Sequence, residues 1–213
     1  MSSTGRKKKD GTASPRREVD FYASPLWAVK SLLDVSGVAK VFKSAANILE
    51  PCCGDMAIVQ AVDDMFPGRV WEVAELRAEE YYKILAFKAS RDLMLAGACP
   101  RDFLTPWELE NTMTMVSQFG PIKPFNICIT NPPFTIWEAF AEKAIRLSDH
   151  TFFLLRLGVL GSKKRFDFWQ AHNPDIYILR DRPSFTNNGQ TDSDYYAWFH
   201  FHEGEQGKWQ VIA

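Results

Sequence analysis

The sequence lacks any long hydrophobic run, although 46% of its 213 residues are hydrophobic. No stretch approaches the roughly 20 apolar residues of a membrane span, and no apolar secretory core follows the charged N-terminus. No internal repeat is visible either. We therefore expect a soluble, cytoplasmic protein that is long enough to bury one large core and is built as a single domain.

Cysteine is scarce, and neither sign of charge is in excess. The four cysteines (Cys52, Cys53, Cys99 and Cys128) show no paired CxxC spacing, which argues against a zinc site and for a reducing compartment. The formal net charge of −1 excludes a polycation. Any nucleic-acid surface must therefore be a local patch.

Basic residues do gather at the N-terminus. Residues 1–18 are polar and carry six basic side chains: Arg6, Lys7, Lys8, Lys9, Arg16 and Arg17. This composition predicts a flexible basic tail. An arm that lies along nucleic-acid phosphates is the alternative interpretation.

The stretch Phe125 to Phe134, FNICITNPPF, predicts a buried strand that ends in a rigid corner, because each proline fixes φ and removes a donor. The Asn131 side-chain carbonyl and the peptide carbonyl of Pro132 can together accept both hydrogens of one planar amine. Phe134 offers a flat face for the ring that carries this amine, and such stacking contributes about 1–3 kcal/mol per base. The corner predicts a site for an amino group on a flat heterocycle; an ordinary strand-ending turn is the alternative.

Two upstream segments predict a second half of the site. The strand NILEP at residues 47–51 leads into a turn at Gly54, where the backbone can approach a ligand that faces a helix N-terminus. The next strand, VWEVAEL, ends at Glu75, about the distance downstream at which α/β folds place an acid on ribose hydroxyls. Ahead of both, we expect a helix with Ser24 as N-cap and Pro25 at the first helical position, whose beginning suits an anion.

Seven predicted strands are interleaved with helices, and the last two run close together. This order predicts an α/β fold: a seven-stranded, mostly parallel sheet with helices on both faces and a C-terminal antiparallel hairpin. Ligands of such sheets bind beyond the carboxyl ends of the strands. Glu50, Glu75, Asp102 and Asn131 would all fall on that edge.

Several motifs stand in the order found in S-adenosylmethionine-dependent adenine-N6 DNA methyltransferases: DFYASP, LEPCCGD, the acid at Glu75, DFL at Asp102, and NPPF. LLRLGVLGSKKR and RPSFTNNGQTDSDYYAWF look like later segments of small phage and prophage members. The chain resembles this family from Asp20 to Phe201. The resemblance implies a Rossmann-like methyltransferase fold over residues 19–213, without a separate target-recognition domain, in a bacterial or phage-infected cell.

The resemblance also implies which residues bind S-adenosylmethionine. They are Tyr22, Ser24, Pro25, Glu50, Pro51, Gly54, Glu75, Asp102 and Phe103. Glu75 would bind the ribose hydroxyls, and Asp102 would accept from the adenine amine with Phe103 against the ring. Met56 stands where the family usually has a second glycine, which predicts a less tight turn under the cofactor.

The catalytic residues implied by the resemblance are Asn131, Pro132, Pro133 and Phe134. An adenine amine is a poor nucleophile, because its lone pair is delocalised into the ring. Acceptors aimed at the amine stabilise the nitrogen as it becomes tetrahedral and cationic. The sulfonium methyl needs only in-line placement, without a metal. A duplex target must also be flipped out of the stack, and Phe134 would hold the flipped base.

DNA is the predicted partner, and a small set of cations would bind its phosphates. These cations are Lys163, Lys164, Arg165 and Arg182, which we expect in loops that open on the same edge as NPPF. A solvated helix start is the alternative for the two lysines. RNA adenine or a protein glutamine amide would fit the same acceptors. A non-catalytic methyltransferase-like binding subunit is a further alternative, against which the intact Asn131 argues.

Overall fold

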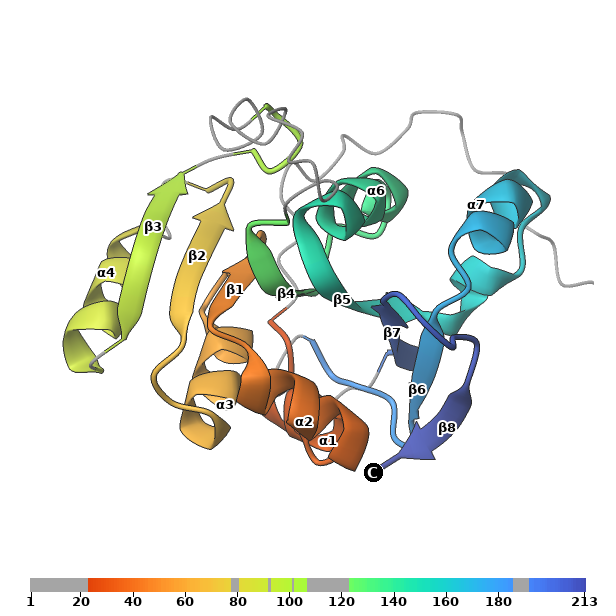
Figure 1. The fold of residues 1–213 in the computed structure, drawn as a ribbon, viewed down its shortest axis with the longest axis horizontal. Coiled ribbons are helices and arrows are strands. Elements are labelled where there is room, and N and C mark those ends of the chain that lie inside the picture. The colour runs from red at the N-terminus through yellow and green to blue at the C-terminus, as the bar shows by residue number, and fades with distance from the viewer. Residues whose placement is uncertain (1–22, 78–80, 92, 101, 107–122, 186–191) are drawn as a thin grey trace, which may run out of the picture.

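The strand segments carry apolar residues at consecutive positions, as expected for strands whose two faces are both buried. In the computed structural model, which describes residues 23–77, 81–91, 93–100, 102–106, 123–185 and 192–213, they form one sheet (Figure 1). Its strands are β1 Asn47–Glu50, β2 Val70–Glu75, β3 Met94–Pro100, β4 Phe125–Thr130, β5 Ser148–Arg156, β6 Asp175–Leu179, β7 Tyr196–Phe201 and β8 Trp209–Ile212. The predicted basic tail and Tyr22 lie outside the described residues.

The strand order is β3-β2-β1-β4-β5-β7-β6-β8. The first five strands in this order run parallel to one another, and β7 is antiparallel to both β5 and β6. The predicted fold class is therefore confirmed. The carboxyl ends of β1 to β6 share one edge of the sheet, which we call the carboxyl edge; the arrowheads of β2 and β3 mark it at the top of Figure 1.

The sheet has one strand more than the seven predicted. The additional strand, β8, pairs with β6 in a parallel register from Ile176↔Trp209 to Leu179↔Ile212. Trp209 and Val211 are exposed and only Ile212 is buried. The segment is four residues long, so it carries too little alternation to predict a strand.

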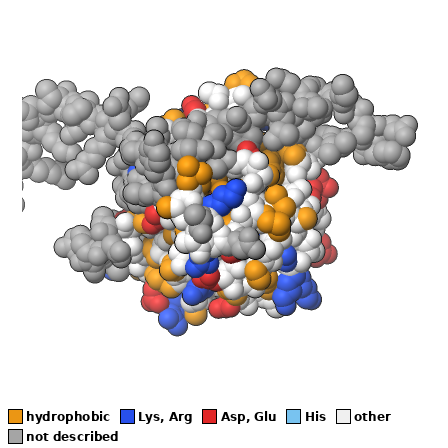
Figure 2. All heavy atoms as spheres, turned by 90° about the vertical axis from the view of Figure 1, so that its left-hand side faces the viewer, with side chains coloured by type: hydrophobic (Ala, Val, Ile, Leu, Met, Phe, Trp, Pro, Cys, Tyr) orange, Lys and Arg blue, Asp and Glu red, His pale blue; other side chains and the backbone are white. Residues whose placement is uncertain are grey.

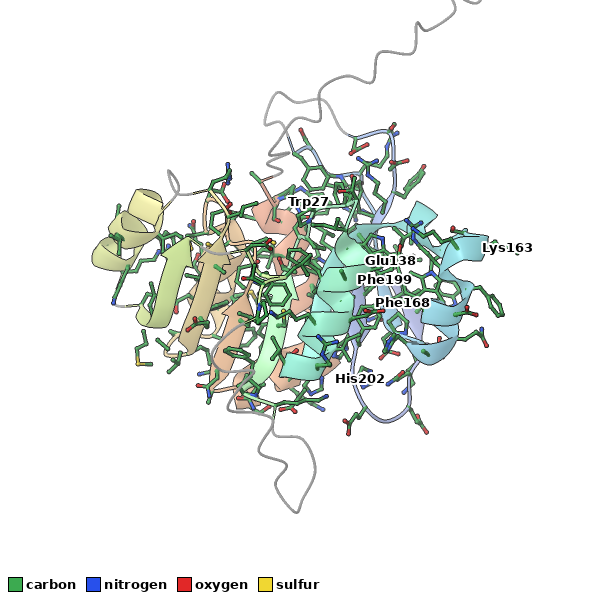
Figure 3. The ribbon with its side chains drawn as sticks, turned by 90° about the horizontal axis from the view of Figure 1, so that it is seen from above. Trp27, Glu138, Lys163, Phe168, Phe199 and His202 are labelled. Atoms are coloured by element: carbon green, nitrogen blue, oxygen red, sulfur yellow. The ribbon has the colours of Figure 1, made fainter. Side chains whose placement is uncertain are left out.

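The described helices cover both faces of the sheet. They are α1 Leu26–Leu33, α2 Ser36–Ser44, α3 Ala57–Met65, α4 Tyr81–Ser90, α6 Trp137–Leu147 and α7 Phe166–Ala171, with 3-10 turns at Leu157–Leu160 and Lys163–Arg165. Helices α1 to α4 contribute to one apolar core, and α6 packs in the other (Figure 1). Along β5, Phe152 and Leu154 face the first core and Phe153 and Leu155 the second. Phe199 of β7 belongs to the second core, and Phe168 of α7 packs against that core (Figure 3).

The start of α1 differs from the sequence prediction. The N-cap is Pro25, not Ser24, and Leu26 is the first helical residue. Pro25 has an extended ψ of 129°, while its carbonyl already accepts from the N–H of Ala28 at 3.0 Å. A residue with that geometry is the cap. No side-chain cap is present at this described terminus, so the predicted capping role of Ser24 is wrong.

None of the helices within the described residues combines the length and the apolar character that crossing a membrane requires.

Candidate active site

The NPPF corner sits at the centre of the carboxyl edge. Strand β4 lies between β1 and β5, and Asn131 follows it directly. Pro132 is buried and Pro133 is exposed, and the peptide bonds before both are trans. The Pro133 carbonyl accepts from the N–H of Ile136 at 3.2 Å, which turns the chain into α6. The half-buried Asn131 is therefore held between a central strand and a helix start.

Phe134 has aromatic and cationic neighbours that sequence reasoning missed. The Arg156 guanidinium carbon lies 4.7 Å from the centre of the Phe134 ring, a cation–π contact. The Tyr196 ring lies 5.8 Å away and the Phe185 ring 6.4 Å away, centre to centre. Arg156 ends β5 and pairs in register with Tyr196, the first residue of β7. The signal in the sequence was an arginine at the end of an apolar run.

Arg156 is itself fixed by a polar network. Its Nε donates to the Tyr196 hydroxyl at 2.9 Å, and that hydroxyl donates to Asp192 Oδ2 at 2.7 Å. A second carboxylate, Asp194, lies 3.0 Å from Arg156 Nη1. Burial raises the pKa of the Tyr196 phenol, and the Asp192 carboxylate adds to this shift. Tyr196 therefore stays protonated and keeps the guanidinium beside the corner.

Glu50 ends β1 with a fully buried side chain. Its Oε1 accepts from the Cys52 N–H at 3.0 Å, whereas Oε2 is buried and has no hydrogen-bond partner among the described residues. Burial raises the pKa of Glu50 to about 8, and the charge of Glu75 adds to the shift, while Thr130 and Cys52 oppose it. A buried acid of this kind is suited to a polar or cationic ligand group.

Gly54 and Glu75 meet across the turn, as the predicted site requires. The Gly54 N–H donates to Glu75 Oε2 at 2.9 Å. Glu75 Oε1 accepts from the backbone N–H of Arg77 at 3.0 Å and from its Nε at 3.1 Å. Arg77 is a second residue that the sequence reasoning missed. The structure thus brings Glu50, Gly54 and Glu75 together at the ends of β1 and β2, with the buried Pro51 between β1 and Gly54.

Met56 takes the conformation that glycine favours. Its φ is +68°, in the left-handed region, and its N–H donates to the Cys53 carbonyl at 2.7 Å. This backbone costs a side-chain-bearing residue about 1–2 kcal/mol. The Met56 side chain is fully buried in the first core, which offsets that cost. The turn is therefore tight despite the missing glycine, contrary to the expectation from the sequence.

The other predicted cofactor residues that the structure describes lie in different settings. Asp102 is exposed, and its Oδ1 accepts from the Leu104 N–H at 2.9 Å in the loop after β3. Phe103 is 1% exposed, and its ring centre lies 5.0 Å from that of Phe140 in α6. Ser24 is buried ahead of α1. The roles of these residues toward a cofactor stay predictions.

The predicted phosphate-binding cations divide into two kinds. Arg165 is tied to α6, because its Nε donates to Glu138 Oε1 at 2.7 Å. Lys163, Lys164 and Arg182 are exposed, and within the described part of the chain no acid pairs with them. Figure 3 shows Lys163 at one end of the molecule, on the side away from β3. The β3 side, which faces the viewer in Figure 2, carries acidic and basic side chains interspersed.

Comparison with known proteins identifies the fold. No protein-family model matches the sequence, and no curated protein matches it significantly. Solved structures do match. One is the methyltransferase subunit of a type I restriction-modification system from Streptococcus thermophilus, with a TM-score of 0.65 and 12% identity. That alignment covers 87% of this chain and 45% of the subunit, so the chain spans less than half of the subunit's length.

Two further structures are covered over most of their length. A protein described as an RNA methyltransferase from Pyrococcus horikoshii has a TM-score of 0.63 and 14% identity, over 86% of this chain and 87% of that one. An O-methyltransferase from Bacillus cereus has a TM-score of 0.53 and 12% identity, over 86% and 83%. The fold is that of methyltransferases. At these identities the likeness extends to the fold and no further.

The raised pKa of Glu50 predicts a pH-dependent cost to stability. Glu50 ordinarily titrates near 4.5 but near 8 in the folded protein, so the folded state holds this proton more tightly. Its favourable contribution is complete below pH 4.5 and is lost as the pH rises through 8. We expect Glu50→Gln to stabilise the cofactor-free protein at pH 8.5 by about 3–5 kcal/mol, with little change at pH 4.5. Urea unfolding of the parent and the variant at the two pH values measures the difference in their free energies of unfolding. An equal difference at both pH values would contradict the raised pKa of Glu50.

Proposed function

We propose that the chain is an S-adenosylmethionine-dependent methyltransferase that methylates the exocyclic N6 amine of adenine in DNA. The observation that carries the proposal is the position of the Asn131-Pro132-Pro133-Phe134 corner. It follows the central strand β4 at the same edge as Glu50, Gly54 and Glu75. A motif suited to a planar amine therefore shares an edge with a turn suited to a nucleoside cofactor.

The cofactor half of the proposal rests on the donor set at β1 and β2. S-adenosylmethionine carries a cationic amino group, and Glu50 Oε2 is a buried acceptor without a partner among the described residues. Glu75 accepts three hydrogen bonds from Gly54 and Arg77, which leaves Oε2 one lone pair to which a ribose hydroxyl can donate. These residues fit the cofactor, which would supply the electrophilic methyl group.

The amine half of the proposal is electrostatic. Asn131 and the Pro132 carbonyl would accept from the two hydrogens of the amine, holding the nitrogen lone pair toward the methyl donor. Positive charge develops on this nitrogen during transfer, so the acceptors stabilise the transition state more than the ground state. Phe134 would stack on the flipped base, with Arg156 against its ring as a rigid support.

Three exposed cations provide a test of the proposed DNA surface. Lys163, Lys164 and Arg182 follow β5 and β6, whose carboxyl ends lie on the same edge as Asn131. We expect the triple change to glutamine to weaken duplex binding and to reduce its logarithmic salt slope by about one unit per lost phosphate contact. Arg165→Gln should add less, because Glu138 already holds that side chain.

Fluorescence anisotropy of a labelled duplex at several salt concentrations measures this slope. The control is Lys40→Gln with Lys43→Gln, which neutralises two exposed lysines of α2. An identical slope in the triple variant and the parent would reject the proposed surface.

The proposed activity is tested by offering three substrates side by side. Purified protein is incubated with labelled S-adenosylmethionine and, separately, unmethylated DNA, RNA and a glutamine-containing protein mixture. Transfer to DNA that depends on adenine supports the proposal. Transfer to RNA or protein alone assigns the same corner to another planar nitrogen, and cofactor binding without transfer to any of the three identifies a binding subunit.

A further inference from the structure

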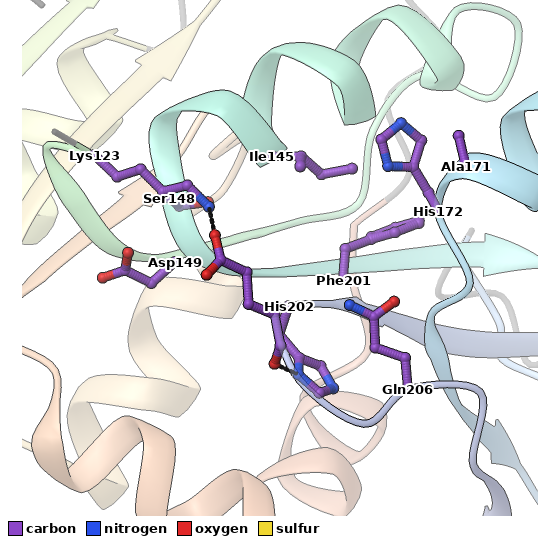
Figure 4. Close-up of a pocket in the computed structure, with 10 residues that line it drawn as sticks. Lys123, Ile145, Ser148, Asp149, Ala171, His172, Phe201, His202 and Gln206 are labelled. Carbon is purple, nitrogen blue, oxygen red and sulfur yellow. Dashed lines mark hydrogen bonds and ion pairs between the residues drawn. The ribbon is translucent and has the colours of Figure 1, made fainter. Parts of the chain in front are cut away.

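A cluster of histidines lies at the edge of the sheet opposite the NPPF corner. Asp175 opens β6 and stands directly opposite His200 of β7, and His202 follows the end of β7. One ring nitrogen from each histidine and one carboxylate oxygen of Asp175 lie within 4.8 Å of one another. The segment after β7, from which His202 comes, also borders a pocket of about 180 Å³ (Figure 4).

The hydrogen bonds of His202 fix which of its nitrogens carries a proton. Its Nδ1 lies 2.7 Å from the Glu203 carbonyl oxygen, which can only accept, so Nδ1–H donates there. In the neutral ring, Nε2 then has only a lone pair. This nitrogen lies 3.2 Å from Asp175 Oδ2, another acceptor. Two acceptors at this distance require a cation between them, either a proton or a metal ion.

The surroundings of His200 favour a metal ion over a proton. It is 5% exposed, and its Nε2 lies 3.0 Å from His150 Nδ1 in a histidine–histidine hydrogen bond. Its Nδ1 is buried and has no hydrogen-bond partner among the described residues. A proton on His202 would satisfy Asp175 but not His200 Nδ1, whereas a metal ion bound through that nitrogen would satisfy all three groups.

We propose that Asp175, His200 and His202 form a binding site for a divalent transition metal such as Zn²⁺. Two imidazoles and one carboxylate are a ligand set that zinc accepts, and water can take the fourth position. Zinc–ligand bonds of about 2.0 Å place tetrahedral ligand atoms about 3.3 Å apart, close to the 3.2 Å between His202 and Asp175. The scarcity of paired cysteines excluded only thiolate sites.

The surroundings of the three ligands suit a bound metal. With a metal ion on His200 Nδ1, His200 Nε2–H would donate to His150 Nδ1, 3.0 Å away, and His150 would orient the ring, the usual role of a partner to a metal-bound histidine. Asp175 Oδ1 accepts from the Lys208 N–H at 2.9 Å. The ion would therefore join β6, β7 and the segment leading to β8. This inference is separate from methyl transfer, because the cluster lies at the edge opposite Asn131.

Zinc binding and thermal unfolding test the site without reference to activity. The full chain is treated with a chelator and titrated with Zn²⁺ against a chromophoric competitor. We expect one tight Zn²⁺ per chain and a rise in Tm of about 5–10 °C when Zn²⁺ exceeds its Kd 100-fold. His202→Gln and Asp175→Asn should each weaken binding by at least about 100-fold, and His150→Gln by about 10- to 100-fold.

Two features keep the test decisive. Asp175→Asn retains an oxygen that can accept from Lys208, so the variant separates loss of the metal from loss of folding. His172→Gln removes another half-buried histidine beside the same pocket and should bind Zn²⁺ like the parent (Figure 4). Equal affinity of the parent and His202→Gln for Zn²⁺, or a parent whose Tm ignores Zn²⁺, overturns the proposal in favour of a protonated His202 paired with Asp175.

Discussion

Replacing Asn131 with alanine is expected to reduce kcat for methyl transfer by about 10²- to 10³-fold, the cost of removing one preorganised group aimed at transition-state charge. The side chain follows β4 at the carboxyl edge, and its amide oxygen is the proposed acceptor for the reacting amine. Cofactor affinity should change by less than about twofold, because the lost interaction belongs to the transition state. Steady-state kinetics with labelled cofactor and calorimetric titration measure the two quantities on one preparation.

Two companion variants sharpen this experiment. Asn131→Asp keeps an acceptor oxygen at the same position and should retain more activity than Asn131→Ala. Thr135→Ala changes an exposed residue of the adjoining turn and should behave like the parent. Turnover by Asn131→Ala near the parental rate, with the fold intact, would remove Asn131 from the mechanism.

Glu75→Ala is expected to raise the Kd for S-adenosylmethionine by about 5- to 150-fold, which corresponds to about 1–3 kcal/mol for an unpaired polar partner. The change deletes a proposed ribose acceptor and also the acceptor that fixes the Gly54 N–H at 2.9 Å. Asp102→Ala should show a loss of the same order if its carboxylate accepts from the adenine amine. In both variants, kcat at saturating cofactor should fall by a smaller factor than the factor by which the Kd rises.

Calorimetric titration with the cofactor or its demethylated product measures these affinities. Glu75→Gln preserves one acceptor oxygen for the turn, so it distinguishes loss of ribose binding from collapse of the Gly54 backbone. Glu142→Ala removes one exposed acid on α6 and corrects for the altered net charge. If neither Glu75→Ala nor Asp102→Ala changed the Kd, the proposed cofactor pocket would be in the wrong place.

The central strands and the edge they share could be predicted because their signals are local. The apolar run before Asn131 is contained in a stretch of about ten residues, and so is the turn at Gly54. Parallel order then places Glu50, Glu75 and Asn131 on one edge. The buried strand predicted before Asn131 is confirmed as β4, Phe125–Thr130.

The remaining features depend on contacts between distant segments. Arg156 reaches Phe134 and Tyr196 only because β5 pairs with β7. Likewise, Asp175 and His200 are 25 positions apart in the sequence but directly opposite in the sheet. The backbone of Met56 was missed for another reason: burial of the side chain in the core offsets the local preference for glycine.

The most direct test of the proposed function is the identity of the methylated product. Unmethylated DNA is incubated with the protein and S-adenosylmethionine, digested to nucleosides and analysed by mass spectrometry. The proposal predicts N6-methyldeoxyadenosine in the parent reaction and only a trace of it with Asn131→Ala. A methyl group found on cytosine, on a ring nitrogen of adenine or on no DNA base, from a protein that binds the cofactor, would contradict it.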